Sequence, residues 1–185
     1  MKNPQGPSVQ AWEAVEAEAV YRCRLFSVVH RRSRSPRTRQ VHDVYVLDAP
    51  DWVNIVPLTA DDQVVMVRQY RHGVADLTLE VPGGMLDEGD RDPLMAARRE
   101  MIEETGYDAD VIDALGATHP NPAIQGNRVH TFVARDAVRR GDPVIGRMEH
   151  TEPVLVPLAR VPELIRTGVI SHALVIVAFH RLAIA

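Results

Sequence analysis

The first half of the chain alternates short apolar runs with turn residues. The runs are rich in Val, Leu and Tyr and show period-two alternation, and Ser-Pro, Ala-Pro-Asp and Ala-Asp-Asp separate them. Such runs are typical of strands, and the Pro and Asp residues between them are typical of turns. We therefore predict that this half is mostly sheet. The expected strands are Tyr21–Val29, Val41–Leu47, Trp52–Leu58, Gln63–Tyr70 and Leu77–Val81.

The first strong helix signal comes at Asp92. An Asp N-cap with Pro93 at the first helical position suits a helix start, and Gly106 suits the residue just past a helix end. Between them, apolar residues recur at three- and four-residue steps, which predicts one buried face. These residues are Leu94, Ala97 and Met101. Strands are expected again at Val111–Ala117, Arg128–Ala134 and Val154–Val156, then helices at Val161–Thr167 and Ser171–Ala183.

The composition is that of an ordinary globular protein. The 185 residues are 45% hydrophobic, and 21 Lys and Arg against 25 Asp and Glu give a net charge of −4. One domain is expected at this length, whereas collagen-like, disordered and disulfide-scaffold classes are excluded. The single cysteine, Cys23, favours a reducing, cytoplasmic compartment. No export signal is predicted, and Val169 to Ala185 is too short and polar to span a bilayer, so no membrane partner is expected.

Charge and histidine spacing exclude two further classes of site. A weakly acidic chain is a poor general binder of nucleic acid, and none is expected as a partner. The local basic run from Arg22 to Arg39 either meets phosphates or forms a solvated hairpin edge, and the sequence leaves both open. The eight histidines show no zinc-binding spacing, so we expect no zinc site.

The predicted helix from Pro93 carries three carboxylates, Glu100, Glu103 and Glu104. At these spacings at least two of them share a face and repel one another. All-oxygen ligands select hard divalent cations such as Mg²⁺ or Mn²⁺, whereas a solvated acidic face is the plain alternative. Upstream, Val81-Pro82-Gly83-Gly84 leads from a predicted strand into an acidic loop that feeds the helix start. A strand, a tight glycine turn and an acidic helix together suit a metal-bound pyrophosphate.

Residues 84–107, GMLDEGDRDPLMAARREMIEETGY, resemble the Nudix box. The second half matches the motif fully, from Arg99 to Tyr107. The first half departs from it: the expected Glu is Asp90, and eight residues rather than seven separate it from Arg99. In the family that acidic residue anchors the arginine, and here either Asp90 or Glu88 is available for this.

The flanking segments resemble the ADP-ribose and nucleoside-diphosphate-sugar pyrophosphatase branch of the family. They are VRQYRH at residues 67–72, LEVPGG at 79–84 and TGVI at 167–170. The resemblance implies a mixed-sheet α/β/α sandwich, in the α+β class, over residues 1–185. Residues 1–50 would form an N-terminal β extension that contributes to a homodimer, and residues 51–185 would form the core.

The resemblance also implies roles for individual residues. Glu100 and Glu104 would be the main Mg²⁺ ligands, Glu103 an additional ligand or orienting group, and the Gly83 carbonyl a backbone ligand; Mn²⁺ is the alternative ion. Arg99 would position a catalytic glutamate. For the general base we expect Glu152, then Glu149, from a loop before a late strand, with His150 as a rival because of its intrinsic pKa.

The substrate would be a small nucleotide sugar. Arg71 and Glu80, with Arg68 as a weaker candidate, would contact it near the diphosphate and ribose, since the Arg fork suits phosphate. Trp52 and Phe26 are candidates for stacking on the base, although both fit a core role. Where the branch often carries a Pro-Gly-aromatic loop with a glutamate, this chain has HPNPAIQGNR at residues 119–128. Its polar members either line the pocket or fix a turn: Gln125, Asn127 and Arg128.

The expected reaction is Mg²⁺-dependent hydrolysis of the pyrophosphate bond of a nucleoside diphosphate linked to ribose or another sugar. ADP-ribose would give AMP and ribose 5-phosphate. Hydrolysis of nucleoside triphosphates or oxidised nucleotides is the alternative activity. A ligand-sensing Nudix domain without turnover is the non-enzymatic alternative.

Overall fold

The structure is a computed structural model, which describes residues 9–87, 89–90, 92–144 and 151–185. The chain forms two compact units. The first contains Met1–Pro50 with Asn121–Asn127, and the second contains Asp51–Pro120 with Arg128–Ala185. The segment 121–127, which the sequence assigned to the core, therefore belongs to the first unit.

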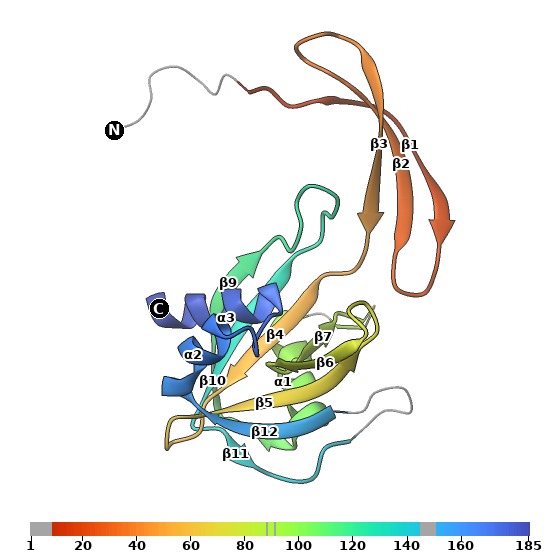
Figure 1. The fold of residues 1–185 in the computed structure, drawn as a ribbon. Coiled ribbons are helices and arrows are strands. Elements are labelled where there is room, and N and C mark those ends of the chain that lie inside the picture. The colour runs from red at the N-terminus through yellow and green to blue at the C-terminus, as the bar shows by residue number, and fades with distance from the viewer. Residues whose placement is uncertain (1–8, 88, 91, 145–150) are drawn as a thin grey trace. The chain divides into compact units, whose positions relative to one another are not determined.

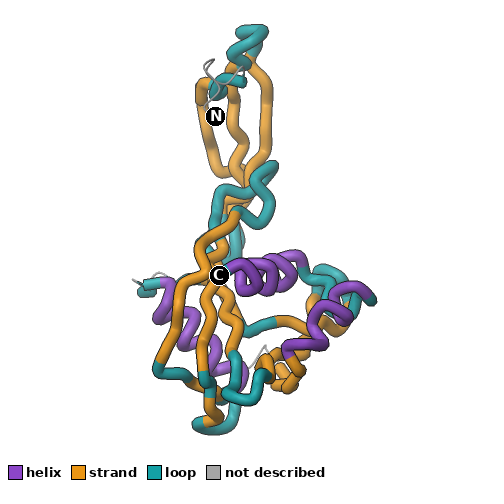
Figure 2. The backbone as a smooth tube through the Cα atoms, turned by 90° about the vertical axis from the view of Figure 1, so that its left-hand side faces the viewer, coloured by secondary structure: helices purple, strands orange, loops and turns teal. Residues whose placement is uncertain are grey.

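The first unit is built on an antiparallel sheet with the order β1-β2-β3. Its strands are β1 (Glu13–Arg22), β2 (Ser27–Arg34) and β3 (Val41–Asp48), as Figures 1 and 2 show. The predicted single strand Tyr21–Val29 is wrong, because the chain turns inside it, where the Cys23 N–H donates to the Phe26 carbonyl at 3.0 Å. Prediction also missed most of β1, whose Glu-Ala repeat has few β-branched residues.

One face of this sheet is apolar in its centre, although Arg31 lies on the same face between Ala17 and Val44. Ala19, Val29 and Val46 stand directly opposite one another across the three strands, so their side chains share a face. Part of the basic run from Arg22 to Arg39 forms ion pairs with acidic residues of β1, since Arg32 contacts Glu16 at 3.3 Å. Arg34 and Arg39 likewise contact Glu13. These ion pairs favour a solvated hairpin over phosphate binding, but the predicted edge is wrong because β2 is the middle strand of the sheet.

The second unit contains a mixed sheet with the order β7-β4-β10-β9, in which β4 and β10 are parallel and the other pairs antiparallel. Its strands are β4 (Trp52–Pro57), β7 (Gly83–Met85), β9 (Val111–Thr118) and β10 (Val129–Arg135). A three-stranded antiparallel sheet has the order β12-β5-β6, from β5 (Gln63–Arg71), β6 (Asp76–Glu80) and β12 (Thr151–Pro157). The short strands β8 (Tyr107–Asp108) and β11 (Val138–Arg139) form a separate pair.

Helices cover both faces of the mixed sheet. On one face, Val53 and Ile55 of β4 pack in one core with Met101 of α1 (Pro93–Thr105). On the other, Val56 packs with Phe179 of α3 (Ala173–Ile184). The second core also takes in η1 (Leu158–Arg160) and α2 (Val161–Arg166). This arrangement confirms the predicted α+β class with a mixed sheet (Figure 1).

The ends of α1 form as the sequence predicts. The Asp92 carboxylate accepts a hydrogen bond from the Leu94 N–H at 2.9 Å, which is an N-cap. Gly106 has a left-handed φ of 72°, and its N–H bonds to the Ile102 carbonyl. The start of α1, and with it the acidic face, is therefore set by local sequence. No helix of the described residues is long and apolar enough to cross a membrane.

Candidate active site

Helix α1 is joined to β7 through Glu104. The Gly83 N–H donates to Glu104 Oε2 at 2.9 Å, and this glutamate is only 8% exposed. A side chain at Gly83 would overlap the Val53 carbonyl of β4. The glycine thus allows β7 to lie close to both β4 and the helix.

Glu100 lies against the next residue of the same strand. A Cβ added to Gly84 would come within 2.6 Å of Glu100 Oε1. The side chain of Glu100 is 14% exposed, so its carboxylate is mostly sheltered beside this backbone. The two predicted main metal ligands, Glu100 and Glu104, therefore both pack against the Gly-Gly strand.

Arg99 lies among the acidic side chains of the motif. It contacts Glu100 at 2.9 Å, Glu103 at 3.1 Å and Asp90 at 3.3 Å. Burial alone would lower the pKa of Arg99, but the surrounding carboxylates raise it overall. The contact with Asp90 shows that the shorter acid reaches the arginine in spite of the extra residue. Glu88, the other candidate anchor, lies outside the described residues.

The chemistry of this cluster suits a hard divalent cation, because its ligands would be carboxylate and carbonyl oxygens. Three carboxylates against one arginine leave a negative excess. Within the described ranges, however, no three acidic, His or Cys side chains are already arranged around one point as a metal site. By its chemistry the donor set therefore fits Mg²⁺ or Mn²⁺, although its carboxylates now bond to Arg99 and to the Gly83 N–H.

Arg71 and Glu80 form a bidentate pair across the β5–β6 hairpin. Arg71 Nε and Nη2 each donate to Glu80 at 2.8 Å, and the Thr78 hydroxyl donates to the same carboxylate at 2.7 Å. The side chain of Glu80 is only 3% exposed, while that of Arg71 is 45% exposed. Burial alone would raise the pKa of Glu80, but the bonds from Arg71 outweigh it and the pKa is lowered. Of the two predicted substrate contacts, Arg71 is thus the accessible one.

Glu152, the first candidate base, pairs with Arg68 at 2.7 Å. Its neighbour Thr151 donates to the Glu104 carbonyl at 3.4 Å and so faces α1. Successive strand side chains point to opposite faces, so Glu152 and Arg68 lie on the face away from α1. The rival candidates Glu149 and His150 lie outside the described residues.

The other predicted contacts have mainly structural partners. Trp52 lies in β4 between Met85 and Val129 of the neighbouring strands. Phe26 belongs to the first unit, where its ring lies 6.4 Å from that of Tyr21. The Asn127 amide donates to the Pro50 carbonyl at 3.1 Å, which favours a turn-fixing role for it.

The same loop contains the last two candidates. Gln125 N–H bonds to the Asn121 carbonyl within the turn, and Gln125 bridges to Leu47 of β3. Arg128 has an exposed side chain, and its backbone N–H donates to Asp51 at 2.7 Å.

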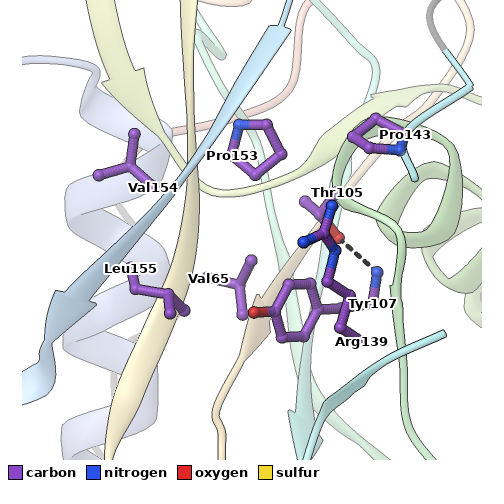
Figure 3. A pocket seen from close by; sticks show the side chains of 8 residues that line it. All are labelled: Val65, Thr105, Tyr107, Arg139, Pro143, Pro153, Val154 and Leu155. Carbon is purple, nitrogen blue, oxygen red and sulfur yellow. Dashed lines mark hydrogen bonds between the residues drawn. The ribbon is translucent and has the colours of Figure 1, made fainter. Parts of the chain in front are cut away.

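A pocket of about 370 Å³ lies elsewhere on the second unit, at the C-terminal end of α1 (Figure 3). It is lined by Val65, Thr105, Tyr107, Arg139, Pro143, Pro153, Val154 and Leu155. None of these residues is a predicted site residue. The pocket is therefore not the predicted active site, whose residues lie on α1, β5, β6 and β7.

Comparison with known proteins identifies the family. A model of the NUDIX domain matches residues 48–178, which is more than half of the chain. The chain belongs to this family. A crystal structure of an ADP compounds hydrolase superposes with a TM-score of 0.82 at 24% identity, over 96% of this chain and 95% of that one. This likeness confirms the Nudix fold.

Two curated relatives align with part of the chain. The methanol dehydrogenase activator of Bacillus methanolicus is 34% identical over 86 residues, 46% of each protein. The ADP-ribose pyrophosphatase of Bacillus subtilis (strain 168) is 31% identical over 91 residues, 49% of each. The chain thus spans about half the length of these relatives.

The surroundings of Glu80 include two residues that sequence reasoning missed. Thr78 donates to its carboxylate, and His172 Nδ1 lies 3.5 Å from its Oε2. Thr78 is two residues from Glu80 in a strand, so the two share a face, and this could have identified it. His172 is 92 positions away in sequence, and no spacing in the chain points to it.

Proposed function

We propose that this Nudix protein is an enzyme that hydrolyses the pyrophosphate bond of a nucleoside diphosphate linked to ribose or another sugar. The observation that carries the proposal is the packing of Glu100 and Glu104 against the Gly83–Gly84 strand. Arg71, held by Glu80 at the end of the adjacent hairpin, adds a cation that suits diphosphate.

A divalent cation, Mg²⁺ or Mn²⁺, completes this proposal. Glu100 and Glu104 would hold it, with Glu103 and the Gly83 carbonyl as further oxygen ligands. When bound, it supplies charge neutralisation on the diphosphate oxygens and a more acidic water. Arg99 would orient Glu100 and Glu103, both of which it contacts.

Arg71 would bind the diphosphate of the substrate through the exposed part of its guanidinium. The 31% identity over 91 residues to the ADP-ribose pyrophosphatase of B. subtilis makes ADP-ribose the first substrate to test. The expected products are AMP and ribose 5-phosphate.

The general base stays a prediction among Glu149, His150 and Glu152. The ion pair with Arg68 on the face of β12 away from α1 weighs against Glu152. Replacement of each residue by Gln separates them, since only loss of the base should lower kcat by a factor of about 10² to 10⁴ without a matching change in KM.

The deciding experiment compares the wild type with Glu104→Gln on ADP-ribose, GDP-mannose, UDP-glucose and a nucleoside triphosphate, with and without Mg²⁺. The matched control is Glu163→Gln, because Glu163 of α2 forms an exposed ion pair with Arg160 of η1. Metal-dependent release of a nucleoside monophosphate by the wild type and the control, but not by Glu104→Gln, supports the proposal.

Other products would favour other activities. Release of pyrophosphate or phosphate from the triphosphate alone would favour the triphosphatase alternative. Metal-independent binding of one compound without cleavage would favour a sensing domain instead.

We also propose that the protein works as a homodimer in the cytoplasm. The apolar face of the β1–β3 sheet around Val29 and Val46 supports a second copy as its cover. The proposal of a cytoplasmic location rests on the single cysteine alone.

A further inference from the structure

We propose that His172 is a positioning residue that acts through Glu80 to hold the Arg71 guanidinium for substrate binding, an inference that rests on the proposed function. Its basis is the geometry around one buried carboxylate, which three side chains from β5, β6 and the start of α3 surround.

The Glu80 carboxylate fixes the orientation of the Arg71 guanidinium. Arg71 uses Nε and Nη2 on the two carboxylate oxygens, and the Thr78 hydroxyl occupies Oε1 as well. On the other oxygen, Oε2, the second neighbour is His172 Nδ1 at 3.5 Å. The Nδ1 atom is buried and has no hydrogen-bond partner among the described residues, so this carboxylate is its available acceptor. The plane of the carboxylate therefore depends on Thr78 at one oxygen and on His172 at the other. The plane of the Arg71 guanidinium follows from it.

The start of α3 is itself fixed, which makes His172 a rigid support. Asn54 of β4 donates its amide to the Leu174 carbonyl at 3.3 Å, and Ile170 just before the helix is fully buried. His172 occupies the N-cap position of α3 but makes no side-chain capping bond. Its side chain therefore serves Glu80 rather than the helix end, and its removal takes away no cap.

The first test measures the Arg71 guanidinium directly, without substrate. We expect the Nε–H proton of Arg71, followed by NMR with ¹⁵N-labelled protein, to exchange with water at least about fivefold faster in His172→Ala than in the wild type. His172→Asn, which retains a donor near the Nδ1 position, should restore slow exchange. His180→Ala, an exposed histidine on the same helix, is the matched control and should leave exchange unchanged. Equal exchange in wild type and His172→Ala would overturn the inference.

The second test uses the substrate that the panel identifies. His172→Ala should raise KM about fivefold and change kcat less than twofold, because Arg71 contacts ground and transition states alike. In an Arg71→Gln background the same substitution should have no further effect on KM. An equal effect of His172→Ala in both backgrounds would overturn the inference, since it would not act through Arg71. If the wild type cleaves no diphosphate sugar, the proposed function fails, and the exchange measurement still decides the role of His172.

Discussion

At the scale of single residues, the absence of a Cβ at Gly84 sets where the Glu100 carboxylate can lie. The methyl group of Gly84→Ala would come within 2.6 Å of Glu100 Oε1 and would push this ligand away from β7. We expect the variant to fold but to lose at least about tenfold in kcat/KM, with a higher Mg²⁺ requirement. Gly73→Ala is the control, because no atom lies within 4 Å of its added Cβ. Equal activity of the two variants would contradict this account.

Asp90 gives a second prediction at this scale. It contacts Arg99 at 3.3 Å and is 20% exposed, whereas Asp87 lies at 3.8 Å and is 80% exposed. Asp90→Ala should therefore lower kcat about three- to tenfold, while Asp87→Ala should have little effect, since exposed pairs contribute little. Steady-state kinetics of both variants at saturating Mg²⁺ test this. A larger loss in Asp87→Ala would show that the other acid anchors Arg99.

Chemistry in a contiguous motif could be predicted from the sequence, whereas contacts between distant segments could not. The placement of Glu100 and Glu104 beside Gly83 and Gly84 follows from motif spacing and two clear helix ends. The partner of Glu152 does not, because which strand pairs with β12 is a tertiary property. His172 shows the same limit, since it reaches Glu80 only through the packing of α3 in the tertiary structure.

At the scale of elements, one arginine docks α3 onto the edge of the mixed sheet. Arg181 donates to the Leu115 carbonyl at 2.7 Å and to the Ala117 carbonyl at 2.8 Å. Gly116 between them has a φ of 104°, and a Cβ there would come within 2.6 Å of Arg181 Nη1. Arg181→Met should lower the free energy of unfolding by about 2 kcal/mol, because two charge-assisted bonds to carbonyls are lost.

Chemical denaturation measures this effect, and Arg166→Met, an exposed arginine of α2, serves as the control with a change near zero. If both variants lower the free energy of unfolding equally, the loss of one positive charge explains the effect, and the bonds from Arg181 to β9 do not.

A pH-dependent prediction concerns the pair that ties α1 to β8. Arg98 donates two hydrogen bonds to Asp108, at 2.7 and 2.8 Å, and these hold the pKa of Asp108 below its ordinary value of 3.8. A lowered folded-state pKa gives stability that is fully present above pH 3.8 and is lost as the pH falls through the folded pKa. Asp108→Asn should thus destabilise by up to about 1 kcal/mol at pH 6, a small value because Arg98 is half-exposed, and by less at pH 3.

Denaturation at the two pH values tests this. The exposed pair of Asp113 with Arg135 gives the control, Asp113→Asn, which should have little effect at either pH. A destabilisation by Asp108→Asn that does not change between pH 6 and pH 3 would contradict the linkage.

Elements also show where local pattern succeeds and fails. Helix α1 has a strong N-cap, a glycine end and an apolar repeat, so its bounds were predictable. The β1–β2 hairpin has neither a glycine turn nor a clear apolar alternation in β1, and prediction merged parts of both strands.

At the scale of the whole molecule, the two units differ in how they bury apolar surface. The second unit has two cores, on both faces of the mixed sheet. In the first, the described residues form a three-stranded sheet whose large apolar side chains include exposed Val15, Val20 and Val44. A sheet of this size needs a packed face to be stable. The proposed second copy of the chain would present the same face and so form a self-complementary cover of the kind found in two-fold dimers.

The proposed dimer therefore predicts the effect of a charge on that face. Val46 lies opposite Val29, in the centre of the apolar rows, whereas Glu18 and His30 stand opposite each other on the other face. Val46→Glu would place a carboxylate in the contact, where burial without a partner is unfavourable. We expect light scattering with size-exclusion chromatography to give a dimer for the wild type and a monomer for Val46→Glu. Glu18→Gln should remain a dimer, so a monomeric wild type, or dissociation by both variants, would exclude this face as the interface.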